Sequence, residues 1–562
     1  MTQRRRWTRR SILSLASRSL AAAPFVGLAP AGLAAARQPN VVLILTDDMR
    51  ADDLGGMKQV GRRIVDAGTS FSRCFATTPL CGPSRSSILR GQYAHNHGVR
   101  GNTGEDAGFA TFRDSGDEQS TIATWLQQHG YRTGLIGKYL NGYADHKDPT
   151  YVPPGWDSWA AAIDHDAYSE YNYQLNENGQ IVGYGHSPSD YLTDVLAGKA
   201  NDFIGTAAGG PFFLYLATYA PHSPSTPAPR HANDLGGAKA PRGPAFNEKD
   251  VSDKPKWVQS TPLMSGSQID KVDQHARDRL RSLEAVDELV GGVLDVLEGG
   301  GLLDNTYVLF ASDNGVFEGE HRQAHGKNAP YEEAIRLPLA IRGPGVAAGA
   351  TSDGLVANID FAPTIAALAG AAAPSFVDGR SLAPLFGGET PSSWRQSLVI
   401  EGFGGVGDDA DSSGGEPVPP FAGLRTNDAL YVEYDSGERE LYNLAADPSE
   451  LENLIKRADP SSVANFAGRL ARLRKAGGKT SRSLEDAPYS LTLPEPKHGG
   501  RRDRGRPRRS GGNHAGGKRR AGKHARGQRV QTHAGRGRTR RSQDANASPP
   551  RRRPRLRRAR HQ

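Results

Sequence analysis

The sequence predicts an α/β protein built on a doubly wound, largely parallel sheet. Apolar runs of strand length recur along the chain, segments with helical periodicity lie between them, and polar or charged residues follow the ends of the runs. Continuous apolar runs are typical of strands that are buried on both faces of a parallel sheet. Their alternation with helices favours an α/β architecture, in which functional groups gather at the carboxyl ends of the strands.

The expected elements follow in chain order. The first strand is expected at residues 40–46, and further strands at 132–136, 211–217, 306–312 and 337–341. Helices are expected at 120–129, 191–205 and 278–297. Short apolar runs separated by turns between residues 397 and 444 predict a small antiparallel sheet, with a helix over residues 463–476 beside it.

Composition divides the chain into four predicted regions. Residues 1–36 contain the pair Arg9-Arg10, a short apolar stretch and an Ala34-Ala35-Ala36 exit, which together indicate a twin-arginine signal peptide. The other regions are a catalytic α/β domain over 37–390, a C-terminal subdomain over 391–490 and an Arg/Gly-rich tail over 491–562. No other segment is apolar enough to span a bilayer, so we expect an exported protein, secreted or associated with the cell envelope.

The net charge of +9 hides a strong asymmetry. Residues 501–562 carry 23 basic and 2 acidic side chains, whereas the body between residues 37 and 500 is acidic. The tail has too few large apolar residues to offset the entropy of ordering, which predicts disorder. Its charge favours binding of a polyanion such as a sulfated polysaccharide or an anionic envelope; nucleic acid, or no role at all, are the alternatives.

The segment 79–91 carries the most specific motif of the chain. It reads Cys81-Gly-Pro-Ser-Arg85 followed by a helical pattern, so that the cysteine is expected at a helix N-terminus, where an anion is stabilised. The segment resembles the signature of the sulfatase family. The resemblance implies that Cys81 is oxidised to formylglycine by a formylglycine-generating enzyme and that the hydrated aldehyde is the nucleophile, with Arg85 holding it. A disulfide to Cys74, the one other cysteine, is the alternative.

Acidic and amide residues follow two of the expected strands. Asp47 and Asp48 come after the strand 40–46, and Asp313 and Asn314 after the strand 306–312. Oxygen ligands alone favour a hard cation, Ca²⁺ or Mg²⁺, although any single Asp at such a place could be a turn or cap residue. In sulfatases the matching positions bind calcium together with the formylglycine, here at position 81.

Basic residues complete the pattern. Residues 130–140 resemble the second sulfatase signature, which implies that Lys138 contacts the sulfate, but Leu140 stands where many members have a histidine. His222, in Pro-His-Ser-Pro, resembles a histidine that lies near the leaving oxygen, and Lys327 resembles a lysine that precedes a Tyr-Glu pair. His321 and His325 are further candidates, with a solvated loop histidine as the alternative.

These motifs predict a sulfatase, a sulfuric ester hydrolase. Segments such as residues 137–141, 152–156 and 220–224 resemble the N-acetylglucosamine-6-sulfatase group, which implies a sulfated amino sugar or glycan as substrate. The alternatives are an arylsulfatase and a phosphate or phosphonate ester hydrolase of the same alkaline-phosphatase-like superfamily. A non-catalytic exported protein that binds polyanions through its tail is the alternative from a different class.

Overall fold

The computed structural model describes residues 37–143, 147–163, 165–404, 416–489 and 493–497. The signal peptide predicted over 1–36 and nearly all of the basic tail predicted over 491–562 lie outside these residues and stay predictions. The domain boundaries placed at 390 and 490 stay predictions as well.

The centre of the molecule is a ten-stranded sheet with the strand order β12-β2-β11-β9-β1-β8-β4-β5-β6-β7. Five neighbouring strands in its middle, β9 to β5 in this order, run parallel. Antiparallel strands flank them: β11 on one side and the β6–β7 hairpin on the other. The predicted doubly wound, largely parallel sheet is therefore confirmed. The parallel strands are β9 (Thr306–Ser312), β1 (Asn40–Thr46), β8 (Phe212–Ala217), β4 (Arg132–Gly137) and β5 (Ser158–Ala162); the others are β12 (Ala350–Ser352), β2 (Thr69–Phe71), β11 (Leu339–Arg342), β6 (Gln174–Glu177) and β7 (Gln180–Gly183).

One expected strand, residues 337–341, is wrong as a single element. Pro338 has no N–H to donate to a sheet ladder, and it separates two strands at this point. The first, β10 (Arg336–Leu337), belongs to a three-stranded sheet with β3 (Cys74–Phe75) and β13 (Val356–Ala357). The second, β11, pairs antiparallel with β9 in the main sheet.

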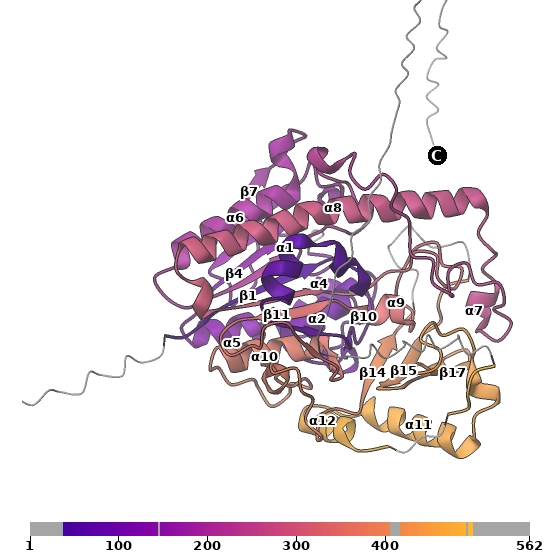
Figure 1. The fold of residues 1–562 in the computed structure, drawn as a ribbon. Coiled ribbons are helices and arrows are strands. Elements are labelled where there is room, and N and C mark those ends of the chain that lie inside the picture. Colours follow the sequence, from indigo (N-terminus) through magenta and orange to yellow (C-terminus); the bar gives the residue numbers. More distant parts are fainter. Residues whose placement is uncertain (1–36, 144–146, 164, 405–415, 490–492, 498–562) are drawn as a thin grey trace, which may run out of the picture. The chain divides into compact units, whose positions relative to one another are not determined.

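Helices cover both faces of the main sheet, as Figure 1 shows. Alternate side chains of β1 point to opposite faces. Val42 and Ile44 pack in one apolar cluster with α6 (Leu192–Ala207) and α8 (Gly266–Gly299), whereas Val41, Leu43 and Leu45 pack in another with α2 (Cys81–Arg90), α5 (Ile122–Gln128) and α10 (Phe361–Leu368). The remaining α-helices of this part are α1 (Lys58–Val60), α3 (Ala94–His97), α4 (Gly108–Asp114), α7 (Lys256–Gln259) and α9 (Glu332–Ile335).

Helix α8 is longer than its apolar pattern predicts. It starts at a capping box in which Ser265 and Gln268 exchange side-chain to backbone hydrogen bonds, so its first turns are stabilised without burial. Those turns expose residues such as Lys271, which is why the apolar period begins only later in the sequence. None of the helices in the described ranges is long and apolar enough to cross a bilayer.

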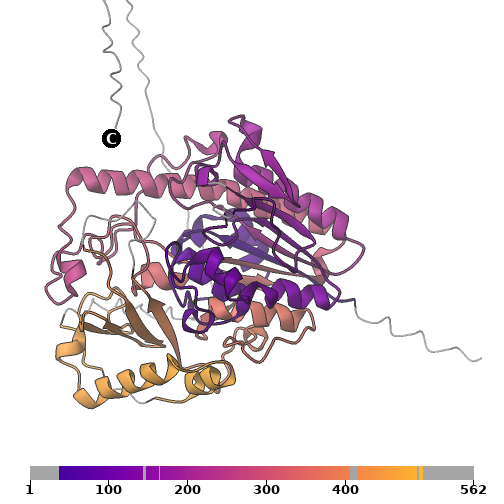
Figure 2. The ribbon, with the colours of Figure 1, turned by 180° about the vertical axis from the view of Figure 1, so that it is seen from behind.

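The predicted small antiparallel sheet is present near the C-terminal end of the described chain (Figure 2). Its strands are β14 (Ser397–Gly402), β15 (Phe421–Thr426), β16 (Ala429–Tyr434) and β17 (Arg439–Asn443), in sequence order. Helix α11 (Pro460–Leu473) packs beside it and is followed by α12 (Lys479–Asp486). Asp459 caps α11 and Pro460 fills its first turn, where no N–H is needed.

Candidate active site

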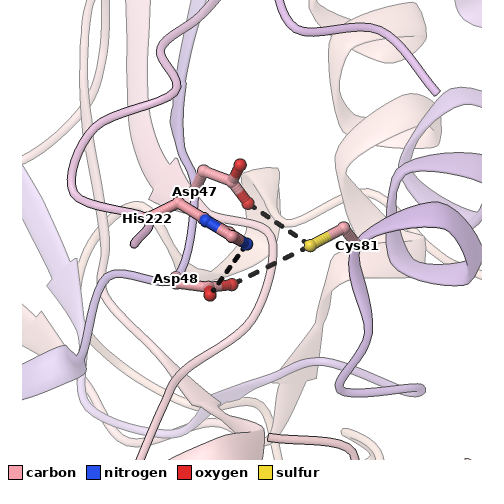
Figure 3. Close-up of side chains that lie close together, drawn as sticks. All are labelled: Asp47, Asp48, Cys81 and His222. Atoms are coloured by element: carbon pink, nitrogen blue, oxygen red, sulfur yellow. Dashed lines mark hydrogen bonds and ion pairs between the residues drawn. The ribbon is translucent and has the colours of Figure 1, made fainter. Parts of the chain in front are cut away.

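The predicted site residues converge at the carboxyl edge of the parallel strands. Asp47 and Asp48 follow β1, Lys138 follows β4, and Asp313 with Asn314 follows β9, whose residue Ser312 is paired in register with Thr46. Helix α2 starts at this edge with Cys81 as its first residue. Figure 3 shows the side chains of Asp47, Asp48, Cys81 and His222 pointing toward one another.

Cys81 lies in the middle of the site and is almost fully buried. Its Sγ is 3.4 Å from Asp47 Oδ1 and 3.8 Å from Asp48 Oδ1, and it accepts a hydrogen bond from Lys327 Nζ at 3.0 Å. Burial, followed by the charge of Asp47, raises the thiol pKa well above its ordinary value. An unmodified Cys81 is therefore a neutral thiol and a weak nucleophile. Both cysteines are free, so the alternative of a disulfide between Cys74 and Cys81 is not realised.

The two lysines neutralise the two aspartates. Lys138 Nζ donates to Asp47 Oδ2 at 2.5 Å, and Lys327 Nζ donates to both oxygens of Asp48 at 2.6 and 2.8 Å. Burial alone would raise the pKa of Asp47, but the positive charges of Lys138, His222 and Arg85 outweigh it and lower that pKa. Burial would likewise lower the pKa of Lys138, but Asp47 raises it well above its usual value. Both groups are therefore charged at neutral pH.

Arg85 connects α2 to the strand ends. Its Nε donates to Asp313 Oδ2 at 2.8 Å and its Nη1 to the backbone oxygen of Lys138 at 3.1 Å. Its Nη2 is buried without a hydrogen-bond acceptor among the described residues and lies 3.7 Å from Asp47 Oδ1. One edge of the guanidinium group is thus left available to an anionic oxygen beside Cys81.

His222 closes the site from the segment after β8. Its Nδ1 donates to the carbonyl oxygen of Ser223 at 2.7 Å, which leaves Nε2 facing Asp48 Oδ2 at 3.5 Å. Its ring packs against Tyr168, with 4.6 Å between ring centroids, and Lys138 Nζ lies 4.9 Å from the centre of the same tyrosine ring. Tyr168 was not predicted, because it lies in a short 3-10 helix without any recognisable motif.

The donor groups fit a divalent cation. Asp47, Asp48, Cys81 and His222 each offer one ligand atom, and these atoms lie within 4.8 Å of one another. Asn314 Oδ1 is buried without a hydrogen-bond partner among the described residues, while its Nδ2 donates to Asp48 Oδ1 at 2.6 Å. Asp313 is more engaged: Oδ2 binds Arg85, and Oδ1 accepts the backbone N–H groups of Asp48 and Asn314. Burial raises the pKa of Asp313.

The structure gives the following contacts for His321, His325 and Leu140. His321 is fully buried and donates Nδ1–H to Glu248 at 2.8 Å instead of facing Cys81. His325 packs its ring against that of His275, with 4.3 Å between centroids. Leu140 belongs to the apolar core together with Tyr139 and Tyr143, so its position does not offer a side chain to the solvent.

Comparison with known proteins gives a consistent answer. The family model for sulfatases matches residues 39–371, and the model for the C-terminal part of N-sulphoglucosamine sulphohydrolase matches residues 319–476. The human N-acetylglucosamine-6-sulfatase is 37% identical over 80% of this chain and 87% of its own length. An arylsulfatase of Volvox carteri is 31% identical over 84% of this chain and 79% of its own length.

Among solved structures, a protein in complex with its substrate D-glucosamine-2-N,6-O-disulfate aligns with a TM-score of 0.65 and 27% identity, covering 80% of this chain and 99% of the other. The family model covers more than half of the chain, and the similarity to the human relative extends over most of both proteins. Sulfatases are generally metal-dependent, in agreement with the acidic cluster beside Cys81. The chain therefore belongs to the sulfatase family and is a sulfuric ester hydrolase.

Proposed function

We propose that this protein removes the 6-O-sulfate from an N-acetylglucosamine unit or a closely related sulfated amino sugar. The observation that carries the proposal is the similarity, over most of both chains, to an N-acetylglucosamine-6-sulfatase. The likeness to a protein solved with a 6-O-sulfated glucosamine supports the same substrate class. An arylsulfatase is the second candidate, because a relative of that name is also similar over most of the chain.

Formylglycine derived from Cys81 is the proposed nucleophile. The Sγ of Cys81 marks the position next to Cβ at which the modified residue would carry its oxygen, between Asp47, Asp48 and Lys327. The raised thiol pKa supports the modification, because the unmodified side chain would be a poor nucleophile here. When present, the hydrated aldehyde supplies a hydroxyl for attack on sulfur and a second hydroxyl that allows sulfate to be released.

Asp47, Asp48 and Asn314, together with the modified residue 81, are the proposed calcium ligands, with magnesium as the alternative. The buried and unbonded Asn314 Oδ1 is the atom that most needs such a partner. Asp313 is proposed as a fifth ligand despite its bonds to Arg85 and the backbone. A bound cation would polarise the sulfate oxygens as a Lewis acid.

The fixed positive groups are proposed to bind the sulfate and to stabilise charge in the transition state. Lys138, Lys327 and the free edge of Arg85 all lie around Cys81 and are buried, so they act in a region of low dielectric constant. His222 is proposed to protonate the departing alcohol through Nε2, because its Nδ1–H is held by Ser223. Leu140 stands where many family members have a histidine, and leucine cannot transfer a proton, so this role is assigned to His222.

Export by the twin-arginine pathway, maturation by a formylglycine-generating enzyme and polyanion binding by the tail are part of the proposal. The twin-arginine pathway carries folded proteins, which agrees with a residue that has to be modified before export.

The test has two parts. Mass spectrometry of the peptide with residue 81, from protein made in its native or a closely related host, should show an aldehyde or its hydrate. Matured protein should then release sulfate from N-acetylglucosamine 6-sulfate at least about 10-fold more efficiently than from 4-nitrophenyl sulfate, with little turnover of a phenyl phosphonate ester. An unmodified thiol in active protein would refute the nucleophile, and preference for the aryl ester would favour the arylsulfatase.

A further inference from the structure

A second group of metal-ligand side chains lies outside the site around Cys81. It consists of His321, Glu333 and Glu450, each of which offers one ligand atom, and these atoms lie within 4.8 Å of one another. The three residues come from separate parts of the chain: His321 from the loop after β9, Glu333 from α9, and Glu450 from the segment after β17. The group shares no residue with the acidic cluster beside Cys81.

The same residues carry buried polar atoms that lack a hydrogen-bond partner. These atoms are His321 Nε2, Glu333 Oε2 and Glu450 Oε1, and none of them has a partner among the residues that the structure describes. His321 and Glu450 are both fully buried. Buried polar atoms are normally hydrogen-bonded, because an unsatisfied one is destabilising, so three such atoms in one cluster call for a shared partner.

The surroundings orient His321 as a ligand. Its Nδ1–H donates to Glu248 Oε2 at 2.8 Å, and Glu248 Oε1 in turn accepts from Lys254 at 3.2 Å. The imidazole ring stacks on Tyr331, with 4.2 Å between ring centroids. A carboxylate on the far nitrogen is the usual companion of a metal-binding histidine, because it fixes the tautomer that leaves Nε2 free to coordinate.

Glu450 is also held in place by a hydrogen bond, and Glu333 connects the cluster to a cavity. Glu450 Oε2 accepts the backbone N–H of Glu332 at 3.0 Å, which leaves Oε1 unbonded. Glu333 is half-buried and lines a cavity of about 450 Å³, whose charged lining also includes Glu320, Glu332, Asp52 and Asp428 and the arginines Arg50, Arg73, Arg336 and Arg425. An ion could therefore enter through this cavity without unfolding of the chain.

We propose that His321, Glu333 and Glu450 bind a divalent first-row transition cation, such as Zn²⁺ or Mn²⁺. An imidazole nitrogen with two carboxylate oxygens suits these ions, whereas Ca²⁺ takes oxygen ligands alone. The ion ties the segment that carries Lys327 and α9 to the segment after β17, so its role is structural. The proposal does not depend on the sulfatase reaction.

The test measures Zn²⁺ binding to the full-length protein, stripped of metal and then saturated with Ca²⁺ so that the oxygen-rich cluster is filled. Isothermal titration and elemental analysis should give one additional tightly bound Zn²⁺ per chain. Substitution with Co²⁺ should give visible absorption bands of a nitrogen and oxygen coordination sphere. The same measurements in a Cys81→Ala protein exclude the thiol as the ligand, because the expected stoichiometry does not change.

Variants locate the ion. His321→Gln and Glu450→Gln should each weaken Zn²⁺ binding by at least about 100-fold, and Glu248→Gln, which only orients the imidazole, by about 10–100-fold. The matched control is His231→Gln, which disrupts a more exposed cluster with Asp234 and Glu284 and should leave the tight site unchanged. Any Zn²⁺ bound by the basic tail is the same in all variants, so it cancels in the comparison.

Two outcomes would overturn the proposal: wild-type protein that binds no transition metal beyond the cluster at Cys81, or unchanged binding in the His321 and Glu450 variants. If those variants fail to fold, the wild-type titration and the Co²⁺ spectrum still decide, because a spectrum without nitrogen ligation contradicts the assignment. Zn²⁺ should also raise the melting temperature of wild-type protein but not that of Glu450→Gln.

Discussion

Glu170 is a buried carboxyl group whose ionisation should control the stability of this protein near neutral pH. It is 2% exposed, and its Oε2 accepts the backbone N–H and the hydroxyl of Thr193 in the first turn of α6, both at 2.9 Å. Burial raises its pKa to about 7, against 4.5 for an exposed glutamate, although the two hydrogen bonds from Thr193 act in the opposite direction. It stands two residues after Tyr168, which packs on His222.

The sign of the effect follows from the two pKa values. Below about pH 4.5 the carboxyl group is protonated in the folded and the unfolded chain, and the advantage of the buried neutral form is fully present. Between pH 4.5 and about 7 the unfolded chain loses the proton and the folded chain keeps it, so stability falls as the pH rises. The difference of about 2.5 pKa units corresponds to about 3 kcal/mol of unfolding free energy, as an order of magnitude.

Glu170→Gln is the perturbation, because glutamine resembles the protonated carboxyl group and cannot ionise. Urea unfolding between pH 5 and 8 should show the variant within about 1 kcal/mol of wild type at pH 5 and more stable by about 3 kcal/mol at pH 8. Glu298→Gln, with a side chain that is 69% exposed, is the matched control and should change stability by less than about 0.5 kcal/mol. A difference between wild type and Glu170→Gln that is constant from pH 5 to 8 would refute the reasoning.

Three further outcomes are expected. Lys327→Met removes the ammonium group that donates hydrogen bonds to both oxygens of Asp48. It should lower kcat/KM by about 10²–10³-fold in matured protein. A loss below about 10-fold in steady-state kinetics would contradict the proposed role of Lys327. Dialysis against a chelator should abolish sulfate release, and added Ca²⁺ should restore it. Full activity of protein that elemental analysis shows to be free of metal would exclude a requirement for the cation. Arg395→Met leaves Asp360 buried without its cation, whereas Glu485 keeps Arg380, and should destabilise the fold by about 3–5 kcal/mol in urea unfolding. A change below about 1 kcal/mol would show that the carboxyl group of Asp360 finds another partner.

The central strands could be predicted because burial on both faces makes them continuously apolar. Residues 40–46 and 306–312 match β1 and β9 as the structure has them. The outer strands β6 and β7 could not be found in this way, because they are short and mix polar with apolar residues. A local signal was present nonetheless: Asn178 and Gly179 form the two-residue turn between them, with φ of 53° and 88°, and an Asn-Gly pair favours this type of hairpin.

The convergence of the site residues could be predicted once the strands had been located in the sequence. Polar residues directly after parallel strands must meet at one edge of the sheet, which brought Asp47, Lys138 and Asp313 together without knowledge of the loops. Tyr168 could not be predicted, since its contact with Lys138 depends on how an irregular segment folds back. The neighbours of His321 were equally hidden, because Glu248 and Glu450 are far from it in sequence.

Lys138 and Lys327 compensate the charge of Asp47 and Asp48, and the same ammonium groups are proposed to bind the sulfate. Asp47 and Asp48 are buried, and a buried carboxylate without a compensating charge is destabilising by several kcal/mol. Lys138 and Lys327 supply that charge through direct ion pairs with the two aspartates. A divalent cation on the same carboxylates would take over the compensation and leave both ammonium groups with an excess of positive charge, which a sulfate ester would balance. A cation at Cys81 would therefore control substrate binding and turnover, while the ion pairs of Lys138 and Lys327 would stabilise the fold around it.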